Sequence, residues 1–208
     1  EPVALGGVLG KGVYLDGLND FIDIGGYYGS QMPRDYYAGI WVDLRAVEKE
    51  PKDRVLFYFA DDSYIGFMKD GANWKLTAHS DSARKSLALG SLLKAGSYHH
   101  VGVMSYIEGG SRVLEILIDG NRVGSLTFAG DRFSLQANFA GSASRLTIGS
   151  PYKQKRSFWD WLFGRVGRRG ALGGWVDEFR LYRLESGEMR PDSYFAEAPW
   201  RREHGAGP

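Results

Sequence analysis

Cysteine is absent from the 208 residues of this chain, and histidine is scarce. Without cysteine there are no disulfides, no thiolate metal sites and no thiol nucleophile. The four histidines are His79, His99, His100 and His204, and the neighbours His99 and His100 are expected to point to opposite faces of a strand. The histidines therefore indicate neither a zinc site nor a Ser-His-Asp triad.

Long apolar runs and a strong net charge are also lacking. No apolar run approaches the ~18 residues of a transmembrane helix. The formal charge of +1 gives no general attraction to nucleic acid. The charge is uneven, because residues 152–172 hold six Lys or Arg against Asp160, a net +5 (6 − 1), which leaves −4 (1 − 5) for the rest. The chain begins at Glu1 rather than Met, so we expect that it was processed or cut from a longer polypeptide.

Glycine and aromatic residues are abundant, with 29 Gly and 14% aromatics. The apolar runs are short, which is typical of strands joined by tight turns, and the length suits a single sandwich or barrel. Asp70-Gly71 and Asp119-Gly120-Asn121 each lie between two such runs and predict hairpins. The pattern predicts about eleven strands, in the segments 12–17, 20–26, 36–44, 54–60, 63–80, 97–106, 112–128, 144–150 and 173–184. Both faces of the run 36–44 are largely apolar, so this strand is expected to be covered on both sides.

Helical signal is confined to the sequence SFWDWLFGRVGRRG at 157–170. Ser157 with Asp160 three residues later forms a weak capping box, and Gly164 or Gly167 would end the helix. We therefore expect a short helical insert near 157–167. The glycine- and proline-containing end of the chain, 191–208, predicts a loose tail.

Three stretches together resemble a known family. They are GVYLDGLNDFIDIG (12–25), SYHHVGVMSY (97–106) continued by EILIDGNRVGS (115–125), and GGWVDEFRLYRLESGEM (173–189). Their order and spacing are similar to the laminin-G-like jelly roll of the concanavalin A-like lectin/glucanase superfamily. Tyr98 replaces the first Trp of the central motif, and the closing motif is two residues shorter between Tyr182 and Glu188. Segment 151–172 is the larger departure, because the family spans this gap with a shorter loop.

The resemblance implies an all-β fold, a two-sheet antiparallel jelly-roll sandwich. It implies one domain over 1–190, with the insert 151–172, followed by the tail 191–208. Members are typically extracellular or attached to a surface, so we expect an extracellular or cell-surface location, with the periplasm as an alternative. They bind carbohydrate or protein partners, or accompany a catalytic module.

Calcium is the cofactor that the resemblance implies, because relatives often hold one ion between the first and last strands. Hard cations take several oxygen ligands. The candidate side chains are Asp16, Asn19 and Asp20 in one turn and Asp177 in the final strand, with Asp20 and Asp177 favoured. The alternative is structural: Asp and Asn form turns by bonding their own backbone, and Asp177 could pair with an Arg.

Sugar recognition needs aromatic platforms beside polar groups. Aromatic candidates near turns are Tyr27, Tyr28, Tyr64 and Trp74. The alternative is that these rings cap the core at strand ends.

The insert raises a separate question, because it is apolar nearly all round from Phe158 to Phe163. It could cover its own sandwich, dock against a partner domain or subunit, or lie in a membrane interface. The contact residues that these readings share are Phe158, Trp159, Trp161, Phe163, Arg165 and Arg168.

Catalysis is not expected. Glycoside hydrolysis needs two carboxylates across a cleft, whereas Asp177 and Glu178 are adjacent and are expected to face opposite ways on a regular strand, and Glu115 lies four positions before Asp119 at a turn. We therefore expect a non-catalytic binding module for a glycan or protein, such as the exposed head of an adhesive or pilus-like assembly. The alternatives are an assembly domain docking through 151–172 and an accessory module of a glycoside hydrolase.

Overall fold

The computed structural model describes residues 3–7, 10–17, 20–24, 33–44, 54–59, 61, 63–80, 83–135, 146–149 and 172–184. Thirteen strands and no helix occur among these residues. Within the same residues no helix is long and apolar enough to cross a membrane. The expected helix near 157–167, the insert up to residue 171 and the tail 191–208 lie outside the described residues.

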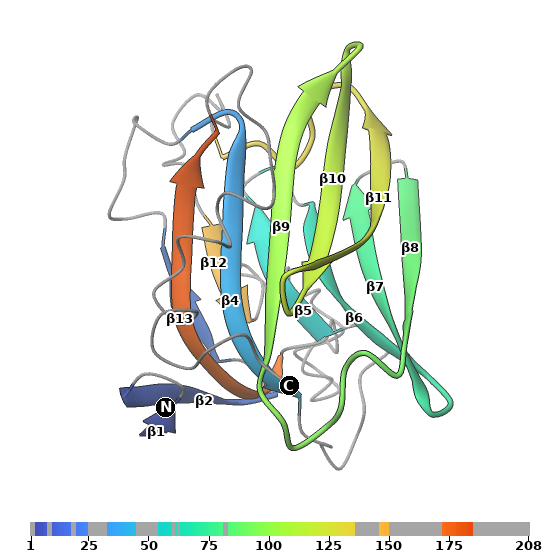
Figure 1. The fold of residues 1–208 in the computed structure, drawn as a ribbon. Helices are drawn as coiled ribbons and strands as arrows, with labels where there is room; N and C mark the ends of the chain where they lie inside the picture. Colours follow the sequence, from blue (N-terminus) through green and yellow to red (C-terminus); the bar gives the residue numbers. More distant parts are fainter. Residues whose placement is uncertain are drawn as a thin grey trace, which may run out of the picture.

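The strands form two antiparallel sheets that lie one behind the other, as Figure 1 shows. The seven-stranded sheet has the order β1-β2-β13-β4-β9-β10-β11 and the six-stranded sheet the order β3-β12-β5-β6-β7-β8. The seven-stranded sheet contains β1 (Val3–Gly7), β2 (Gly10–Asp16), β4 (Tyr36–Leu44), β9 (His99–Glu108), β10 (Ser111–Ile118), β11 (Asn121–Ala129) and β13 (Gly173–Arg183). The six-stranded sheet contains β3 (Phe21–Asp23), β5 (Arg54–Phe59), β6 (Tyr64–Asp70), β7 (Asn73–Ser80), β8 (Ala83–Gly90) and β12 (Leu146–Gly149). The expected two-sheet antiparallel sandwich is confirmed.

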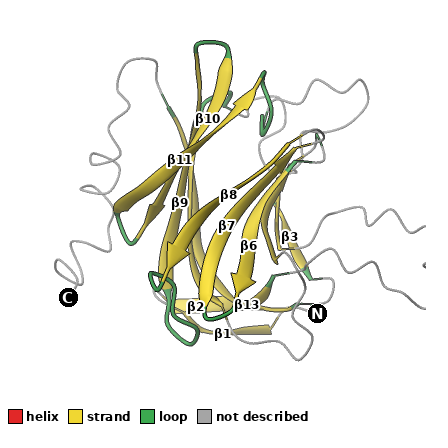
Figure 2. Cartoon of the chain, turned by 90° about the vertical axis from the view of Figure 1, so that its right-hand side faces the viewer, coloured by secondary structure: helices red, strands yellow, loops and turns green. Residues whose placement is uncertain are grey.

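The last strand lies inside the seven-stranded sheet, because β13 pairs with β2 on one side and β4 on the other. An early strand, β2, and the last described strand, β13, are therefore neighbours in one sheet, as expected for a jelly roll. Seen from the side in Figure 2, the sheets are two separate layers.

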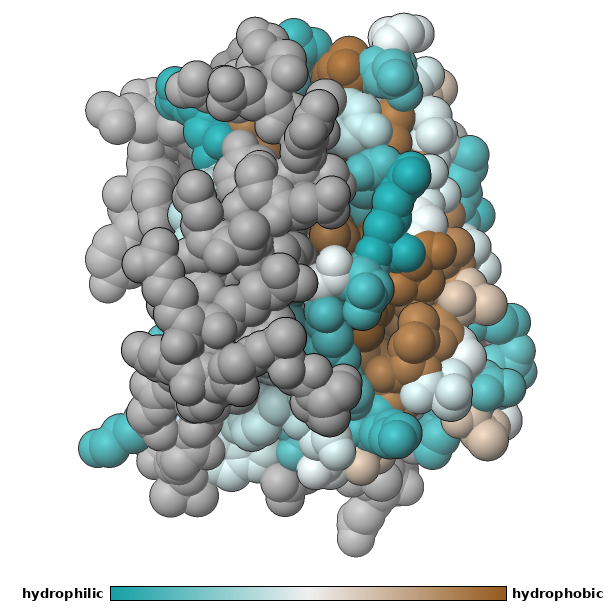
Figure 3. Space-filling view, viewed as in Figure 1, coloured by the Kyte–Doolittle hydropathy of each residue, from teal (hydrophilic) through white to brown (hydrophobic). Residues whose placement is uncertain are grey.

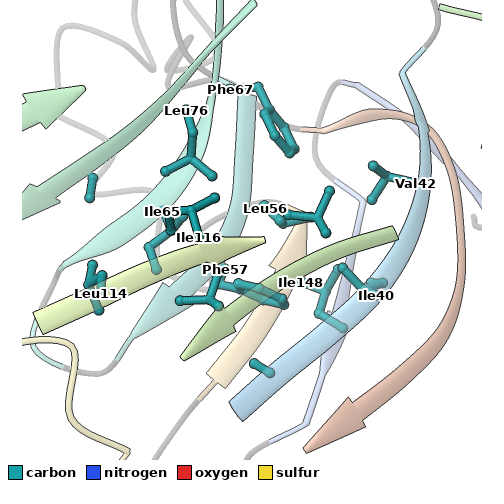
Figure 4. Close-up of a cluster of buried hydrophobic side chains, with 14 of the residues drawn as sticks. Ile40, Val42, Leu56, Phe57, Ile65, Phe67, Leu76, Leu114, Ile116 and Ile148 are labelled. Atoms are coloured by element: carbon teal, nitrogen blue, oxygen red, sulfur yellow. The ribbon is translucent and has the colours of Figure 1, made fainter. Parts of the chain in front are cut away.

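The core fills the space between the layers with alternate side chains of both sheets. Ile40 and Val42 of β4 face Phe57 of β5 and Ile65 of β6 across this space, as Figure 4 shows. Each of these four side chains is at most 2% exposed. Because successive side chains of a strand point to opposite faces, the residues between the core positions of β4, among them Trp41, lie on the outer face of the seven-stranded sheet.

The predicted hairpins are confirmed at both turns. Ile118 pairs with Asn121 across a two-residue turn, and Asp119 and Gly120 have φ of 50° and 84°. Two successive positive φ values match the type I′ turn that Asp-Gly favours. The second turn joins β6 to β7, where Asp70 pairs with Asn73 around Gly71, which has φ of 60°.

Candidate functional site

The carboxylate of Asp20 binds the backbone of Asp16 across the first turn. Asp20 is buried, and its Oδ2 accepts the backbone N–H of Asp16 at 3.1 Å. This contact fits the alternative to calcium binding, in which a turn carboxylate accepts a hydrogen bond from a nearby backbone N–H. Asn19 lies outside the described residues.

Asp177 is not brought to this turn. Asp16 lies opposite Gly173, so Asp177 is four residues farther along β13, about 13 Å at ~3.3 Å per residue. Its Oδ1 accepts the backbone N–H of Glu178 at 2.8 Å. Within the described parts of the chain, no three His, Asp or Glu side chains gather closely enough to hold a metal ion. Calcium binding therefore stays a prediction.

The aromatic candidates have different surroundings. Trp74 is only 4% exposed and packs edge-on against Phe67, with the Arg54 guanidinium 5.1 Å from the centre of its ring. This burial corrects the expectation that Trp74 offers an accessible ring. Tyr64 is half-buried on the outer face of the six-stranded sheet, where its ring stacks on His79 with centroids 5.0 Å apart.

The remaining predicted contact residues lie outside the described residues. They are Tyr27 and Tyr28 before β4, and Phe158, Trp159, Trp161, Phe163, Arg165 and Arg168 in the insert. Their roles stay predictions.

A second group of aromatic and polar side chains lies on the outer face of the seven-stranded sheet. We call this surface the front face and define it by Tyr14, Tyr37, Trp41, His100, Trp175, Asp177, Arg180 and Tyr182. The strand register places these side chains in rows across β13, β4 and β9, and Tyr14 of β2 extends the first row. Trp175 lies opposite Asp43 and Tyr182 opposite Tyr37, so from Trp175 to Tyr182 the face spans six residues of β4, about 20 Å at ~3.3 Å per residue.

Three pairs of rings define the rows. Tyr14 and Trp175 lie opposite each other, with ring centroids 5.2 Å apart. Trp41 meets the ring of His100 edge-on at 5.3 Å. The Tyr182 ring lies 6.1 Å from that of Tyr37, and Tyr182 as a residue is 40% exposed. The front face therefore offers rings that are held in place by neighbours yet remain partly accessible.

Two glycines leave room for the central ring of the front face. Gly39 of β4 pairs with Gly102 of β9. A Cβ on Gly102 would lie 2.7 Å from the Tyr37 hydroxyl, and a Cβ on Gly39 would lie 2.9 Å from both Tyr37 Cε1 and His100 Nε2. Since real Cβ contacts are longer, the Tyr37 ring requires glycine at both positions.

A β-bulge in β13 shapes the charged part of the front face. Asp177 pairs with Trp41 and Arg180 with Gly39, so three steps along β13 match two along β4. The extra residue is Glu178, whose φ of 48° is uncommon for a residue other than glycine. Its Oε2 accepts a hydrogen bond from Arg180 Nη2 at 2.9 Å.

Burial sets the protonation of the central groups. It lowers the pKa of His100 to about 4, so this imidazole is neutral at physiological pH. Burial also raises the pKa of the Tyr37 hydroxyl, which therefore stays protonated. Neither group is poised to exchange a proton near pH 7.

The described carboxylates of this region make structural hydrogen bonds. Asp43 Oδ1 accepts the backbone N–H of Gly96 at 2.8 Å, Asp177 accepts that of Glu178, and Glu178 pairs with Arg180. An acid and a base facing each other across a cleft would be needed for hydrolysis. Each of these three described carboxylates instead contacts a backbone N–H group or a neighbouring guanidinium.

His99 and Asp119 also have a structural role. His99 Nδ1 lies 2.7 Å from Asp119 Oδ2, and His99 Nε2 accepts the backbone N–H of Lys94 at 3.0 Å. Because the acceptor nitrogen is already occupied, it cannot take a proton from a nucleophile. His99 is therefore a half-buried residue whose two ring nitrogens are both engaged in hydrogen bonds.

Turn signals in the sequence do not point to the front face. The rings expected to contact a sugar lie near turns, whereas Trp41 and Trp175 lie inside strands. The signal that could have found them is the series Tyr37, Gly39, Trp41, in which a glycine separates two rings on one face.

Apolar atoms of this side of the molecule gather between β11 and β8, as Figure 3 shows. Here the edges of the two sheets meet, and Leu87 packs over Gly124, where a Cβ would lie 2.9 Å from Leu87 Cδ1. This patch closes the sandwich and lies apart from the rows of β13 and β4.

No model of a known protein family matches the chain, and no curated protein matches it in sequence. Solved structures are similar in fold at low identity. A pentraxin from Limulus polyphemus matches with a TM-score of 0.60 and 10% identity, over 86% of this chain and 77% of the pentraxin.

Two further similar structures were solved with sugars. The CBM40 of a Ruminococcus gnavus sialidase, bound to α2,3-sialyllactose, matches with a TM-score of 0.56 and 12% identity, over 89% of this chain and 95% of the CBM40. Domain 4 of the extracellular arabinanase AbnA from Geobacillus stearothermophilus, in complex with arabinotriose, matches with a TM-score of 0.53 and 17% identity, over 88% of this chain and 75% of that domain. The chain thus has a two-sheet antiparallel jelly-roll fold.

Proposed function

We propose that this chain is a non-catalytic, extracellular binding module that holds a glycan on the front face. The observation that carries the proposal is the set of partly accessible rings, Trp41, Trp175 and Tyr182, beside the Arg180–Glu178 pair. Sugars present C–H groups to aromatic rings and hydroxyl groups to polar side chains, so both kinds of contact are required together. A face about 20 Å long suits an oligosaccharide better than a single sugar.

The fold supports this function by analogy. Two of the similar structures, the CBM40 and the AbnA domain, contain bound oligosaccharides. Because both belong to glycan-degrading enzymes, the accessory module of a glycoside hydrolase is the second candidate for the parent protein. We keep the laminin-G-like module over residues 1–190 as part of the proposal.

A glycan array tests the function. The wild-type chain should bind at least one glycan class, and Trp41→Ala should weaken that binding by more than about tenfold, the loss typical of a central aromatic contact. The matched control is Tyr64→Ala, which removes a half-buried ring from the outer face of the other sheet and should change binding by less than about twofold. Circular dichroism of both variants checks that they are folded.

If the chain binds no glycan on the array but captures a protein partner, the ligand is a protein and the glycan proposal is wrong. Equal losses in Trp41→Ala and Tyr64→Ala would move the site away from the front face.

A further inference from the structure

The charged pair of the front face can bind more than its own partner. Arg180 and Glu178 share one hydrogen bond of 2.9 Å, Arg180 also bonds the Tyr182 side chain, and the side chains of Arg180 and Glu178 remain 25% and 30% exposed. A guanidinium has five N–H donors and a carboxylate accepts at about four sites, so both groups keep capacity beyond these bonds. The pair therefore presents donors and acceptors side by side.

The bulge in β13 positions this pair among the rings. Arg180 is opposite Gly39, which has no side chain, and the next row contains Tyr37 and Tyr182. On the other side of Arg180, the neighbouring row contains Trp41 and Asp177. A ligand lying along β4 would thus meet rings in the rows before and after the charged pair.

The positive charge of Arg180 is matched on the described part of this face. Glu178 neutralises it directly, Asp177 adds a carboxylate in the adjoining row, and Asp43 adds a buried carboxylate two rows away, opposite Trp175. His100 adds no positive charge, because burial lowers its pKa to about 4. A sulfate or carboxylate group would have to displace Glu178 or face Asp177, and either costs free energy through lost or repulsive contacts.

We infer that the glycan held by the front face is uncharged and is recognised through neighbouring hydroxyl groups, one accepting from Arg180 and the next donating to Glu178. A pair of adjacent hydroxyls fits because each hydroxyl both donates and accepts. This inference rests on the proposed function and narrows its ligand class.

Titration calorimetry with two matched sets of oligosaccharides tests the ligand class. The uncharged set is arabino-, xylo- and malto-oligosaccharides, and the anionic set is oligogalacturonides and heparin oligosaccharides of similar length. We expect binding within the uncharged set, with a Kd that changes less than about twofold between 50 and 500 mM NaCl, because no net charge is neutralised. Anionic glycans should bind at least tenfold more weakly.

The variant Glu178→Gln tests the role of the pair. It keeps the shape of the side chain and its left-handed backbone but removes the charge. It should weaken binding of the uncharged ligand about tenfold and reduce the difference in affinity between uncharged and anionic ligands. An unchanged unfolding midpoint is the control for folding. Lys75→Gln removes a charge from the other sheet and should leave both affinities unchanged.

The possible failures are distinguishable. Tight, salt-sensitive binding of an anionic glycan that Trp41→Ala abolishes would overturn this inference and keep the proposed function. Binding of uncharged glycans that Glu178→Gln does not alter would remove the pair from recognition. No binding in either set would overturn the proposed function and this inference with it.

Discussion

His100 is the residue of the front face whose chemistry depends most on its surroundings. It is 6% exposed, and its ring meets Trp41 edge-on. Burial lowers its pKa to about 4, so it remains neutral where an exposed histidine would begin to gain charge. The spacing of His99 and His100 predicts that they face opposite sides of the sheet. The spacing cannot predict that His100 is buried, because its neighbours Gly39 and Tyr37 belong to β4, some 60 residues earlier in the chain.

This residue predicts how stability changes with pH. Between pH 6.5 and 4 the unfolded state binds a proton at His100 that the folded state does not, so acid favours unfolding. The free energy of unfolding should fall by about 2 kcal/mol more in the wild type than in His100→Gln between pH 7 and pH 4.5. Urea unfolding of both proteins at the two pH values measures this difference. The same fall in both proteins would show that His100 is not buried in a neutral form.

The hairpin of β10 and β11 shows how one side chain can secure an element. Asp119 at its turn has φ of 50°, and its carboxylate accepts from His99 Nδ1 and from the His100 backbone, both at 2.7 Å. The turn thereby fastens β9 to the hairpin beside the front face. The sequence Asp-Gly-Asn predicts the turn, whereas the two contacts depend on pairing between strands.

Replacing Asp119 with alanine should lower the free energy of unfolding by about 2 kcal/mol, because two hydrogen bonds to a charged group are lost and alanine is disfavoured at positive φ. Asp119→Asn is the control, since asparagine tolerates this backbone conformation and can still accept a hydrogen bond. It should cost less than half as much. Chemical denaturation compares the three proteins, and similar stability of all three would contradict this role of the carboxylate.

Central strands could be predicted better than edge strands and irregularities. The run Tyr36–Leu44 predicts a strand covered on both sides, and all its residues but Trp41 are buried. The two strands that the sequence pattern did not indicate, β1 and β8, are both edges of their sheets. Edge strands pack less and alternate less clearly, and β8 carries exposed Arg84 and Lys85. The bulge at Glu178 could not be predicted, because the residue with positive φ is not a glycine.

At the scale of the whole molecule, the sandwich accounts for the site by bringing distant segments together. β2, β4, β9 and β13 come from all parts of the chain and are neighbours in one sheet. The three sequence motifs predict a two-sheet antiparallel jelly roll, and the described strands confirm that architecture. The ligand-facing rows could not be predicted, because they depend on the register between β13 and β4, including the shift at the bulge.

The front face as the site of glycan binding is the central claim, and a nuclear magnetic resonance titration tests it most directly. The wild-type chain, labelled with ¹⁵N, is titrated with the glycan that binds most tightly on the array. The account predicts that the largest shifts belong to the indole N–H groups of Trp41 and Trp175 and to backbone amides of β4, β9 and β13, including that of Arg180. Shifts confined to the six-stranded sheet, around Tyr64 and His79, would contradict it.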